Sequence, residues 1–253
     1  AKLVKSDRLA AIGELAGMVG HDLRNPLTGI KGALYYLKTK CAETDVKAKE
    51  MFGVIEKDIN YSNKIINDLL DYSKNLTLEL VNTTPKLLLK NALSLIKVPK
   101  RIKIVNATED KLAIKADTMS ISRVFVNIIS NAIDAMPEGG TLTVTSKAVK
   151  GKMKIVFKDT GIGMSKETLS KLKHGSPLFT TKAKGMGLGL PICRRIVEAH
   201  RGKISLESTL GKGTTITIAV PVNPKPANEG NEKWVFNEPR LLVAPTMNEK
   251  GRD

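Results

Sequence analysis

Aromatic residues, cysteines and long apolar runs are all scarce in this chain of 253 residues. Phe, Tyr and Trp together make up 4% of it, and no stretch approaches the roughly 18 apolar residues that a membrane-spanning helix needs. The two cysteines, Cys41 and Cys193, lie far apart and form no CxxC pair. The sequence therefore predicts neither a disulfide framework nor a zinc site, and a reducing cytoplasmic location fits.

Residues 1–17 form a charged amphipathic pattern that lacks the apolar core and the small-residue cleavage site of a signal peptide. The amphipathic helical pattern is present from the first residue, so we expect an upstream sensor or linker in the full-length protein. Within the segment itself, the sequence predicts no contact with a membrane.

Positive charge is concentrated in the middle of the chain. Of the net charge of +16, residues 81–221 contribute +15, with 24 Lys and Arg against 9 Asp and Glu. Such a region attracts polyanions, which include nucleic acids, anionic membranes and small molecules such as ATP. The lysines are not interleaved with aromatic residues and match no RNA- or DNA-binding motif, which argues against a nucleic-acid partner.

Two long amphipathic helices are predicted first. In the first helix, apolar residues recur every three or four positions, as one buried face requires: Leu9, Ile12, Ala16, Val19, Leu23, Leu27, Ile30, Leu34 and Leu37. The second helix runs from about Val46 to Lys74, and a polar link over residues 38–45 joins the two. A hairpin of two helices leaves an apolar stripe that one partner helix cannot cover, so we expect two copies to form a four-helix bundle.

Helices alternate with strands from residue 77 onward. Strands are expected over residues 77–81, 101–105 and 111–116 (the last two as a pair), 141–149 and 152–159 (a hairpin), 202–208 and 213–220. Helices are expected over residues 85–96, 117–135 and 188–199, the second of them N-capped by Asp117.

The expected fold class is therefore α+β. A helical hairpin over residues 1–76, forming the dimeric four-helix bundle, is followed by an α/β two-layer sandwich over residues 77–221. A flexible tail is expected over residues 222–253, although its apolar run at residues 234–236 could dock on the rest of the chain.

His21 is the most informative residue of the sequence. It falls outside the apolar stripe of its helix, next to Asp22, and should be reachable by solvent. Pro26 lacks an N–H and its ring clashes with the carbonyl of Asp22, so a kink is expected beside the histidine. An exposed imidazole next to a carboxylate at a kink indicates a nucleophile, although a surface histidine on a bundle helix is the simpler interpretation. His200, by contrast, is expected to cap a helix end.

Two clusters carry polar residues with a spacing that suits nucleotide binding. Asn127 and Asn131 stand one helical turn apart on one face, and their carboxamide oxygens can join phosphates and water around Mg²⁺. Asp159 ends a strand and is followed by Gly161 and Gly163, which permit positive φ and a close approach of the backbone to a planar ligand. Taken alone, each feature would also suit capping, solvated or turn residues.

A glycine-rich stretch, GMGLGL over residues 185–190, opens the predicted helix 188–199. Gly185, Gly187 and Gly189 leave the amides of the helix N-terminus free for phosphate oxygens. The stretch is neither a P-loop nor a dinucleotide fingerprint, since it lacks the Lys-Ser/Thr pair of the former and the third glycine of the latter. The preceding basic loop, with Lys173 and Lys182, is expected to close over the ligand.

In order and spacing, the histidine motif and the clusters over residues 127–136, 159–164, 177–182 and 185–190 closely resemble the sensor histidine kinases of two-component systems. The resemblance covers roughly residues 9–220. It implies a dimerising helical hairpin joined to the ATPase sandwich that DNA gyrase and a heat-shock chaperone share. Many members carry a basic residue where Asp134 stands, and here that stretch is similar to the nitrogen-regulatory kinases.

The resemblance implies ATP and Mg²⁺ as cofactors, with a response-regulator receiver domain and a second copy of the chain as partners. His21 would accept the γ-phosphoryl group, Asp22 would hold its imidazole in the correct tautomer, and Asn25 would orient water when the regulator is dephosphorylated. The implied nucleotide-binding residues are Asn127 and Asn131 on the Mg²⁺ side, Asp159 at the adenine amine, Lys182 at the γ-phosphate, and Asp134, Gly161, Gly163, Gly185, Gly187, Leu188 and Gly189.

Three other functions would use parts of the same pattern. A gyrase- or chaperone-type ATPase shares the nucleotide site but needs no histidine hairpin. A serine kinase of the anti-sigma type would form an acid-stable phosphate, and a non-catalytic scaffold would bind a partner without turnover.

Overall fold

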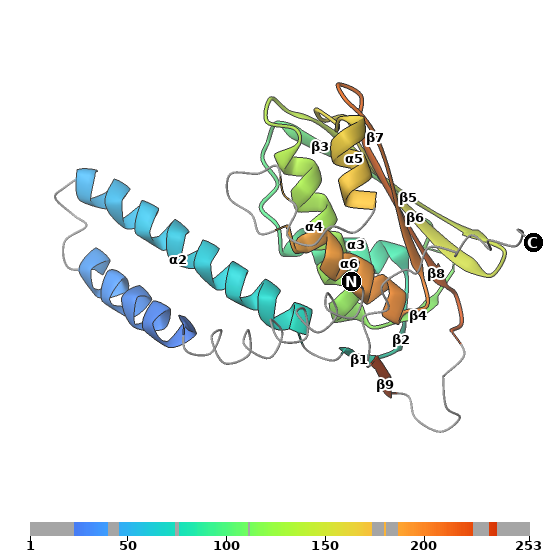
Figure 1. The fold of residues 1–253 in the computed structure, drawn as a ribbon, viewed down its shortest axis with the longest axis horizontal. Coiled ribbons are helices and arrows are strands. Elements are labelled where there is room, and N and C mark those ends of the chain that lie inside the picture. The colour runs from blue at the N-terminus through green and yellow to red at the C-terminus, as the bar shows by residue number, and fades with distance from the viewer. Residues whose placement is uncertain are drawn as a thin grey trace, which may run out of the picture.

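The computed structural model describes residues 23–39, 46–73, 76–110, 112–173, 180, 187–224 and 233–236. They form a long helical hairpin and an α/β body, which project away from each other in Figure 1. His21 and Asp22 lie outside these described residues. In the part of the chain that the structure describes, no helix is both long and apolar enough to cross a bilayer.

The hairpin consists of a helix described over residues 23–39 and α2 (Val46–Ser73). Two side-chain contacts show that the helices are antiparallel: Arg24 donates to Asn67 at 2.8 Å, and Lys38 pairs with Glu56 at 3.1 Å. The predicted helix pair is therefore confirmed, and α2 ends one residue before the expected position.

The body is built on a five-stranded sheet in the order β3-β5-β6-β8-β7, as far as the described residues go. Its strands are β3 (Ile102–Ala107), β5 (Gly140–Val149), β6 (Lys152–Asp159), β7 (Lys203–Thr209) and β8 (Gly213–Pro221). β3 runs parallel to β5, and the other neighbours are antiparallel.

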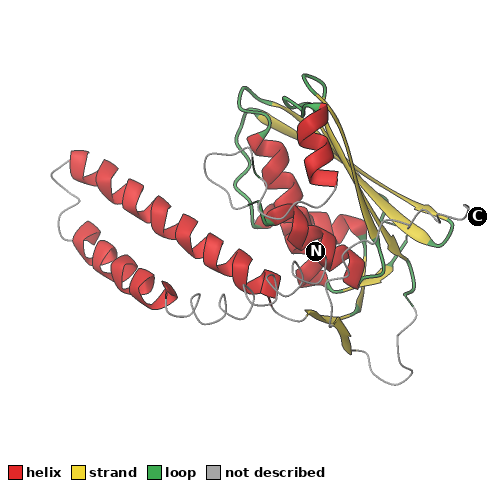
Figure 2. Cartoon of the chain, in the orientation of Figure 1, coloured by secondary structure: helices red, strands yellow, loops and turns green. Residues whose placement is uncertain are grey.

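Three helices cover one face of this sheet, as Figure 2 shows in red against yellow. They are α3 (Pro85–Ser94), α4 (Thr118–Asp134) and α6 (Gly189–Ala199). Their apolar faces and the inner face of the sheet form one continuous hydrophobic core. The predicted two-layer α/β sandwich is thereby confirmed.

β6 illustrates why the sheet buries one face. Met153, Ile155 and Phe157 are buried while the lysines between and around them are exposed, because successive side chains of a strand point to opposite faces. Phe157 packs edge-on against Phe125 of α4, with ring centroids 4.9 Å apart and planes at 76°. Asp159 occupies the next inward position, so a carboxylate ends a row of core side chains.

Two small sheets differ from the expected pairing. The expected strand 77–81 is divided into β1 (Leu76–Glu79) and β2 (Val81–Thr83), and β2 pairs with β4 (Ile114–Ala116). The prediction that 101–105 and 111–116 form a pair is therefore wrong.

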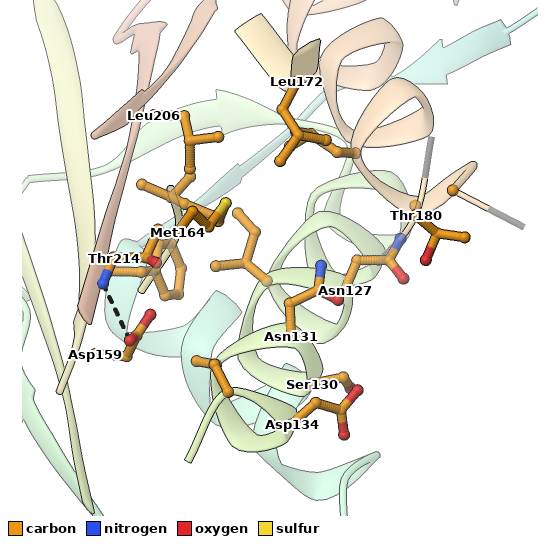
Figure 3. A pocket seen from close by; sticks show the side chains of 18 of the residues that line it. Asn127, Ser130, Asn131, Asp134, Asp159, Met164, Leu172, Thr180, Leu206 and Thr214 are labelled. Carbon is orange, nitrogen blue, oxygen red and sulfur yellow. Dashed lines mark hydrogen bonds between the residues drawn. The ribbon is translucent and has the colours of Figure 1, made fainter. Parts of the chain in front are cut away.

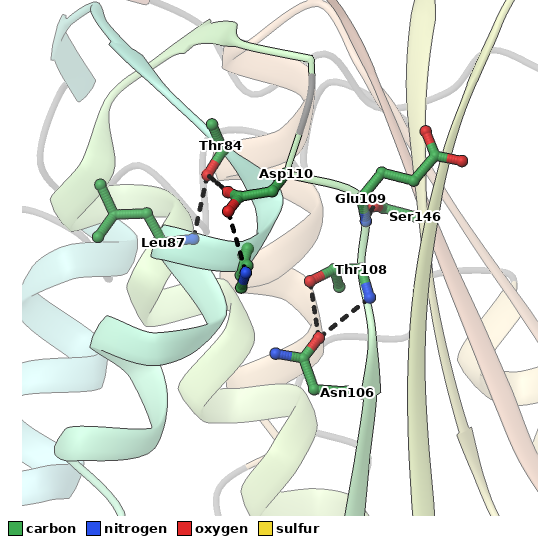
Figure 4. A network of polar contacts seen from close by, with 8 residues as sticks. Thr84, Leu87, Asn106, Thr108, Glu109, Asp110 and Ser146 are labelled. Atoms are coloured by element: carbon green, nitrogen blue, oxygen red, sulfur yellow. Dashed lines mark hydrogen bonds and ion pairs between the residues drawn. The ribbon is translucent and has the colours of Figure 1, made fainter.

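Figure 4 shows polar contacts at the chain surface that accompany this pairing. Asp110, in the segment after β3, forms an ion pair with Lys86 at 3.0 Å and accepts a hydrogen bond from Thr84 at 3.2 Å. Both partners lie at the start of α3, directly after β2. These contacts hold the chain beside β2 before it enters β4.

The tail expected over residues 222–253 contains one strand among its described residues. This strand, β9 (Lys233–Phe236), pairs antiparallel with β1, which agrees with the expectation that the apolar run at residues 234–236 could dock. Residues expected to be a loop form α5 (Lys166–Lys173). Ser165 accepts the N–H of Thr168 at 3.2 Å, and Lys171 pairs with Glu167 one turn away at 2.7 Å, which explains why the helix begins and holds there.

Asp117 joins three elements of the body. Its Oδ1 accepts the N–H of Ser120 at 2.8 Å and caps α4, as predicted, and its Oδ2 accepts the N–H of Glu79 in β1 at 2.8 Å. Its own N–H donates to Nε2 of His200 at 3.0 Å. His200 ends α6, as predicted, and its Nδ1 lies 2.7 Å from the carbonyl of Ile196. Because Nε2 accepts, Nδ1 carries the proton of a neutral ring.

The stability of the body should fall below about pH 6.5 because of His200. Burial lowers the pKa of His200 below its ordinary value, so the unfolded chain binds a proton more readily than the folded one. The stabilisation is therefore complete above the unfolded pKa and is lost as the pH falls below it, by up to about 1.4 kcal/mol at pH 5.5.

Urea unfolding of the wild-type chain and of His200→Gln, compared at pH 7.5 and pH 5.5, measures this effect. The wild-type chain should lose more stability than the variant between the two pH values. Equal losses would contradict a buried neutral histidine.

Candidate functional site

A cavity of about 410 Å³ opens between α4, the N-terminus of α6 and the inner face of the sheet. Figure 3 shows the side chains that line it. The sequence-predicted residues that it brings together are Asn127, Asn131, Asp134, Asp159, Gly163, Gly187, Leu188 and Gly189. Lys182 and Gly185 lie outside the described residues, as do His21 and Asp22.

Asp159 lies at the sheet side of the cavity and is only 6% exposed. Its Oδ1 accepts two backbone N–H groups, from Gly161 at 2.9 Å and from Thr214 at 3.1 Å. Burial raises the pKa of Asp159 above its ordinary value, while these two donors act in the opposite direction. With Oδ1 held in place, Oδ2 is left to accept a hydrogen bond from a ligand.

The surroundings of Asp159 are apolar. Leu142, Phe157, Leu206 and Ile216 line the cavity with it. A buried acceptor among such side chains suits a flat, mostly apolar ligand with one donor at its edge, because a polar edge left without a partner would be costly to bury. An aminopurine ring meets this description.

The two glycines after Asp159 lie close to other parts of the backbone. A Cβ on Gly161 would collide with the carbonyl of Ala135 at the end of α4, and one on Gly163 would collide with the carbonyl of Thr209 at the end of β7. Gly163 also has φ of +64° and lines the cavity, whereas Gly161 does not. Both positions therefore need glycine for packing, and the expected close approach to a ligand stays a prediction.

Asn127 and Asn131 project from α4 into the opposite side of the cavity (Figure 3). The Nδ2 of Asn127 is buried and meets no hydrogen-bond criterion with any described residue, although the Cys193 thiol lies beside the carboxamide, which lowers the pKa of that thiol against the larger effect of burial. A buried polar atom with no partner in the protein suits a bound polar ligand. Rotation of the carboxamide by 180° would present its oxygen, the atom that Mg²⁺ prefers.

The N-terminus of α6 lies next to Asn127. A Cβ on Gly189 would be 3.9 Å from Oδ1 of Asn127, and the N-cap residue Leu188 provides no side-chain cap. The first amides of α6 are therefore available to an anion. Phosphate oxygens would fit between these amides and the asparagines.

Several residues of the site escaped sequence reasoning. Thr214 binds Asp159 through its backbone N–H, and Gly213 has φ of +89° beside the Asp159 carbonyl. Tyr61 and Asp68 of α2 also line the cavity. Asn25 is exposed on the hairpin and is not part of the lining. Lys173 belongs to the last turn of α5, so its assignment to the loop is wrong.

Comparison with known proteins agrees with this geometry. A family model described as the His Kinase A (phospho-acceptor) domain matches residues 11–77, and one described as the histidine kinase-, DNA gyrase B- and HSP90-like ATPase matches residues 116–224. The solved catalytic domain of the histidine kinase ThkA is 32% identical with a TM-score of 0.52, and 97% of it is covered by 58% of this chain. The chain belongs to the histidine kinases.

Other histidine kinases match over more of the chain. Sporulation kinase C of Bacillus subtilis (strain 168) is 35% identical over 227 residues, which cover 86% of this chain and 51% of that protein. The structure of ThkA in complex with the response regulator protein TrrA is 30% identical with a TM-score of 0.61, and covers 85% of this chain and 63% of that one. The chain thus spans about half the length of the sporulation kinase.

Replacing Gly163 should be more harmful than replacing a glycine of similar φ elsewhere. Gly151, in the turn between β5 and β6, has φ of +73° but no atom within 4 Å of an added Cβ. Alanine at either position would incur about 1 kcal/mol of backbone strain. Gly163→Ala would add about 2 kcal/mol because the backbone near Thr209 must move. Denaturant unfolding of Gly163→Ala and Gly151→Ala measures this difference in the free energy of unfolding. Equal losses in the two variants would show that the loop at Gly163 shifts without cost.

Proposed function

We propose that this chain is the catalytic core of an ATP-dependent protein-histidine kinase that phosphorylates itself on His21. The observation that carries the proposal is the cavity. It has a buried carboxylate at one end. At the other end, beside a helix N-terminus, it has a buried carboxamide nitrogen with no hydrogen-bond partner among the described residues. The match of residues 11–77 to a phosphoacceptor family supports His21 as the receiving residue.

The nucleotide would lie across the cavity. Oδ2 of Asp159 would accept a hydrogen bond from the adenine amine. The phosphates would extend toward Asn127, Asn131 and the first turn of α6, with Gly187, Leu188 and Gly189 supplying backbone groups. Lys182 is our candidate for the lysine that contacts the γ-phosphate, and Gly185 for a hinge of its loop.

Asn127 and Asn131 would hold Mg²⁺ together with the phosphates. No cluster of three or more His, Cys, Asp or Glu side chains that could hold a metal occurs among the described residues, but Mg²⁺ commonly takes few protein ligands when phosphates and water supply the rest. Mg²⁺ would contribute neutralisation of phosphate charge, on which phosphoryl transfer depends. Asp134 lines the same cavity one turn further along α4.

His21 would act as a neutral nucleophile. An imidazole with an ordinary pKa of about 6.5 is mostly deprotonated at pH 7. Asp22 would accept a hydrogen bond from Nδ1–H, which leaves the lone pair of Nε2 for the γ-phosphorus. The bond from phosphorus to the bridging oxygen breaks as the bond to Nε2 forms, and ADP leaves.

The phosphoryl group would then pass to an aspartate of a response-regulator receiver domain. The relative solved with a response regulator supports this class of partner. Asn25, exposed one turn after His21, would orient water when the regulator is dephosphorylated. ATP and such regulators would meet the chain in the cytoplasm.

A homodimer would bury the apolar residues that a single hairpin leaves in water. The exposed side chains include Leu23, Ile30, Leu37, Met51, Val54 and Ile55. Because burial of such side chains contributes about 25 cal/mol per Å², pairing two hairpins into a four-helix bundle would stabilise both.

An ATPase of the gyrase or chaperone type is the alternative with the same nucleotide site. The phosphoacceptor match over residues 11–77 favours the kinase, since a plain ATPase does not need that hairpin. A serine kinase and a non-catalytic scaffold lack comparable support.

Replacing His21 with Gln should abolish phosphoprotein formation and leave nucleotide affinity nearly unchanged, because His21 falls in the phosphoacceptor match and outside the residues that match the ATPase family. The measurement is labelling with [γ-³²P]ATP followed by acid and base treatment, with calorimetry of ADP binding as the control. The wild-type label should be acid-labile and base-stable. Acid-labile label persisting in His21→Gln would overturn the assignment.

Replacing Asp159 with Asn should weaken ATP and ADP binding by about 1–3 kcal/mol, since an amide can present a donor to the adenine amine and leave a buried group mispaired. Guanine carries a carbonyl where adenine carries its amino group, so GTP and GDP should lose less binding free energy than ATP and ADP. Calorimetry with each nucleotide tests this expectation. Equal losses for ADP and GDP would show that Asp159 does not recognise the base.

A further inference from the structure

One face of α2 forms a wall of the nucleotide cavity. Tyr61, Lys64, Ile65 and Asp68 line it together with residues of α4 and α6. Their spacing of three and four residues puts all of them on a single side of the helix. The hairpin that carries the phosphoacceptor therefore touches the cavity directly in this arrangement.

An ion pair links that wall to α4. The guanidinium of Arg123 lies 3.1 Å from Oδ1 of Asp68, and the two side chains are 30% and 17% exposed. Arg123 stands on α4 one turn before Asn127. Both charges of the pair act on the buried thiol of Cys193, a neighbour of Asn127. Asp68 lines the cavity and Arg123 does not, so the guanidinium lies behind Asp68, beside the asparagine end of the cavity.

The phosphates proposed for that end would act on the two charges in opposite ways. They would repel the carboxylate of Asp68 and attract the guanidinium of Arg123, whose planar donors match phosphate oxygens. The half-buried position of the pair limits screening by salt, so Asp68 and the phosphates would compete for Arg123 at ordinary ionic strength.

We propose that Arg123 exchanges Asp68 for the phosphates of the bound nucleotide, and that nucleotide binding thereby releases α2 from the ATP-binding body. Asp68 and Arg123 act as a latch between the hairpin and the body when no nucleotide is bound. Release gives the body the freedom to approach the phosphoacceptor histidine. The inference rests on the proposed function, because it requires a nucleotide in this cavity.

The first test is the affinity for Mg²⁺ and a non-hydrolysable ATP analogue, measured by calorimetry. Asp68→Asn removes the competitor and should tighten binding about fivefold, at the low end of couplings between sites. In the Asp68→Asn background, Arg123→Gln removes the proposed phosphate contact and should weaken binding. Glu56→Gln, which breaks the exposed pair with Lys38 in the same hairpin, is the matched control and should have no effect.

The second test is the distance between spin labels at Lys57 and Lys103, which are exposed on α2 and on β3. Cys41 is replaced by Ser, Cys193 is 1% exposed and escapes labelling, and labelled chains are diluted with unlabelled ones. ADP with Mg²⁺ should change the distance distribution of the wild-type chain, and Asp68→Asn should show the same change without nucleotide.

The outcomes separate the two proposals. A wild-type chain that binds no nucleotide overturns the proposed function. Binding with unchanged label distances, or Asp68→Asn that binds no more tightly than Glu56→Gln, overturns the latch and leaves the kinase assignment intact.

Discussion

The contact between Phe125 and Phe157 joins α4 to the sheet, the two elements that carry the polar residues of the cavity. The rings meet edge-on in the core, both almost fully buried, an arrangement that the ring quadrupoles favour. Asn127 follows Phe125 by two residues on α4, and Asp159 follows Phe157 by two residues on β6. Asn127 and Asp159 form the two polar ends of the site, and neither takes part in the contact between the rings. The distance between these two residues therefore depends on how α4 packs against the sheet.

Polar contacts at the edges of the core hold α4 and α6 in the orientation that this packing requires. Asp117 caps α4, holds β1 through Glu79 and binds His200 at the end of α6. These contacts require His200 to be neutral and in one orientation, because its Nε2 accepts the N–H of Asp117 and its Nδ1 faces the carbonyl of Ile196. Such a buried network favours one arrangement of the elements because every alternative would leave a polar group without a partner.

The hairpin has two faces with different contacts. Its outer face exposes apolar side chains that suit a second copy of the chain, while one face of α2 contacts the body beside the asparagines. Among the described residues, α2 meets the body through the ion pair of Asp68 with Arg123, through side chains that line the cavity, and through Leu69, which packs against the edge of the core. The core of the body is formed instead by three helices and the sheet, which share one apolar cluster.

Local periodicity and motifs with fixed spacing were enough to predict the main helices and strands of the body, the helix caps at Asp117 and His200, and eight residues of the cavity lining, among them Asn127, Asp159 and Gly189. Three further points depend on contacts between distant segments. The pairing of β2 with β4 and of β1 with β9 joins segments distant in the sequence, and short strands carry too little pattern to identify their partners. The close backbone contacts at Gly161 and Gly163 depend on where α4 and β7 end. The ion pair between Asp68 and Arg123 depends on how the hairpin meets the body, which no local pattern encodes, since contacts between distant segments follow from packing as a whole.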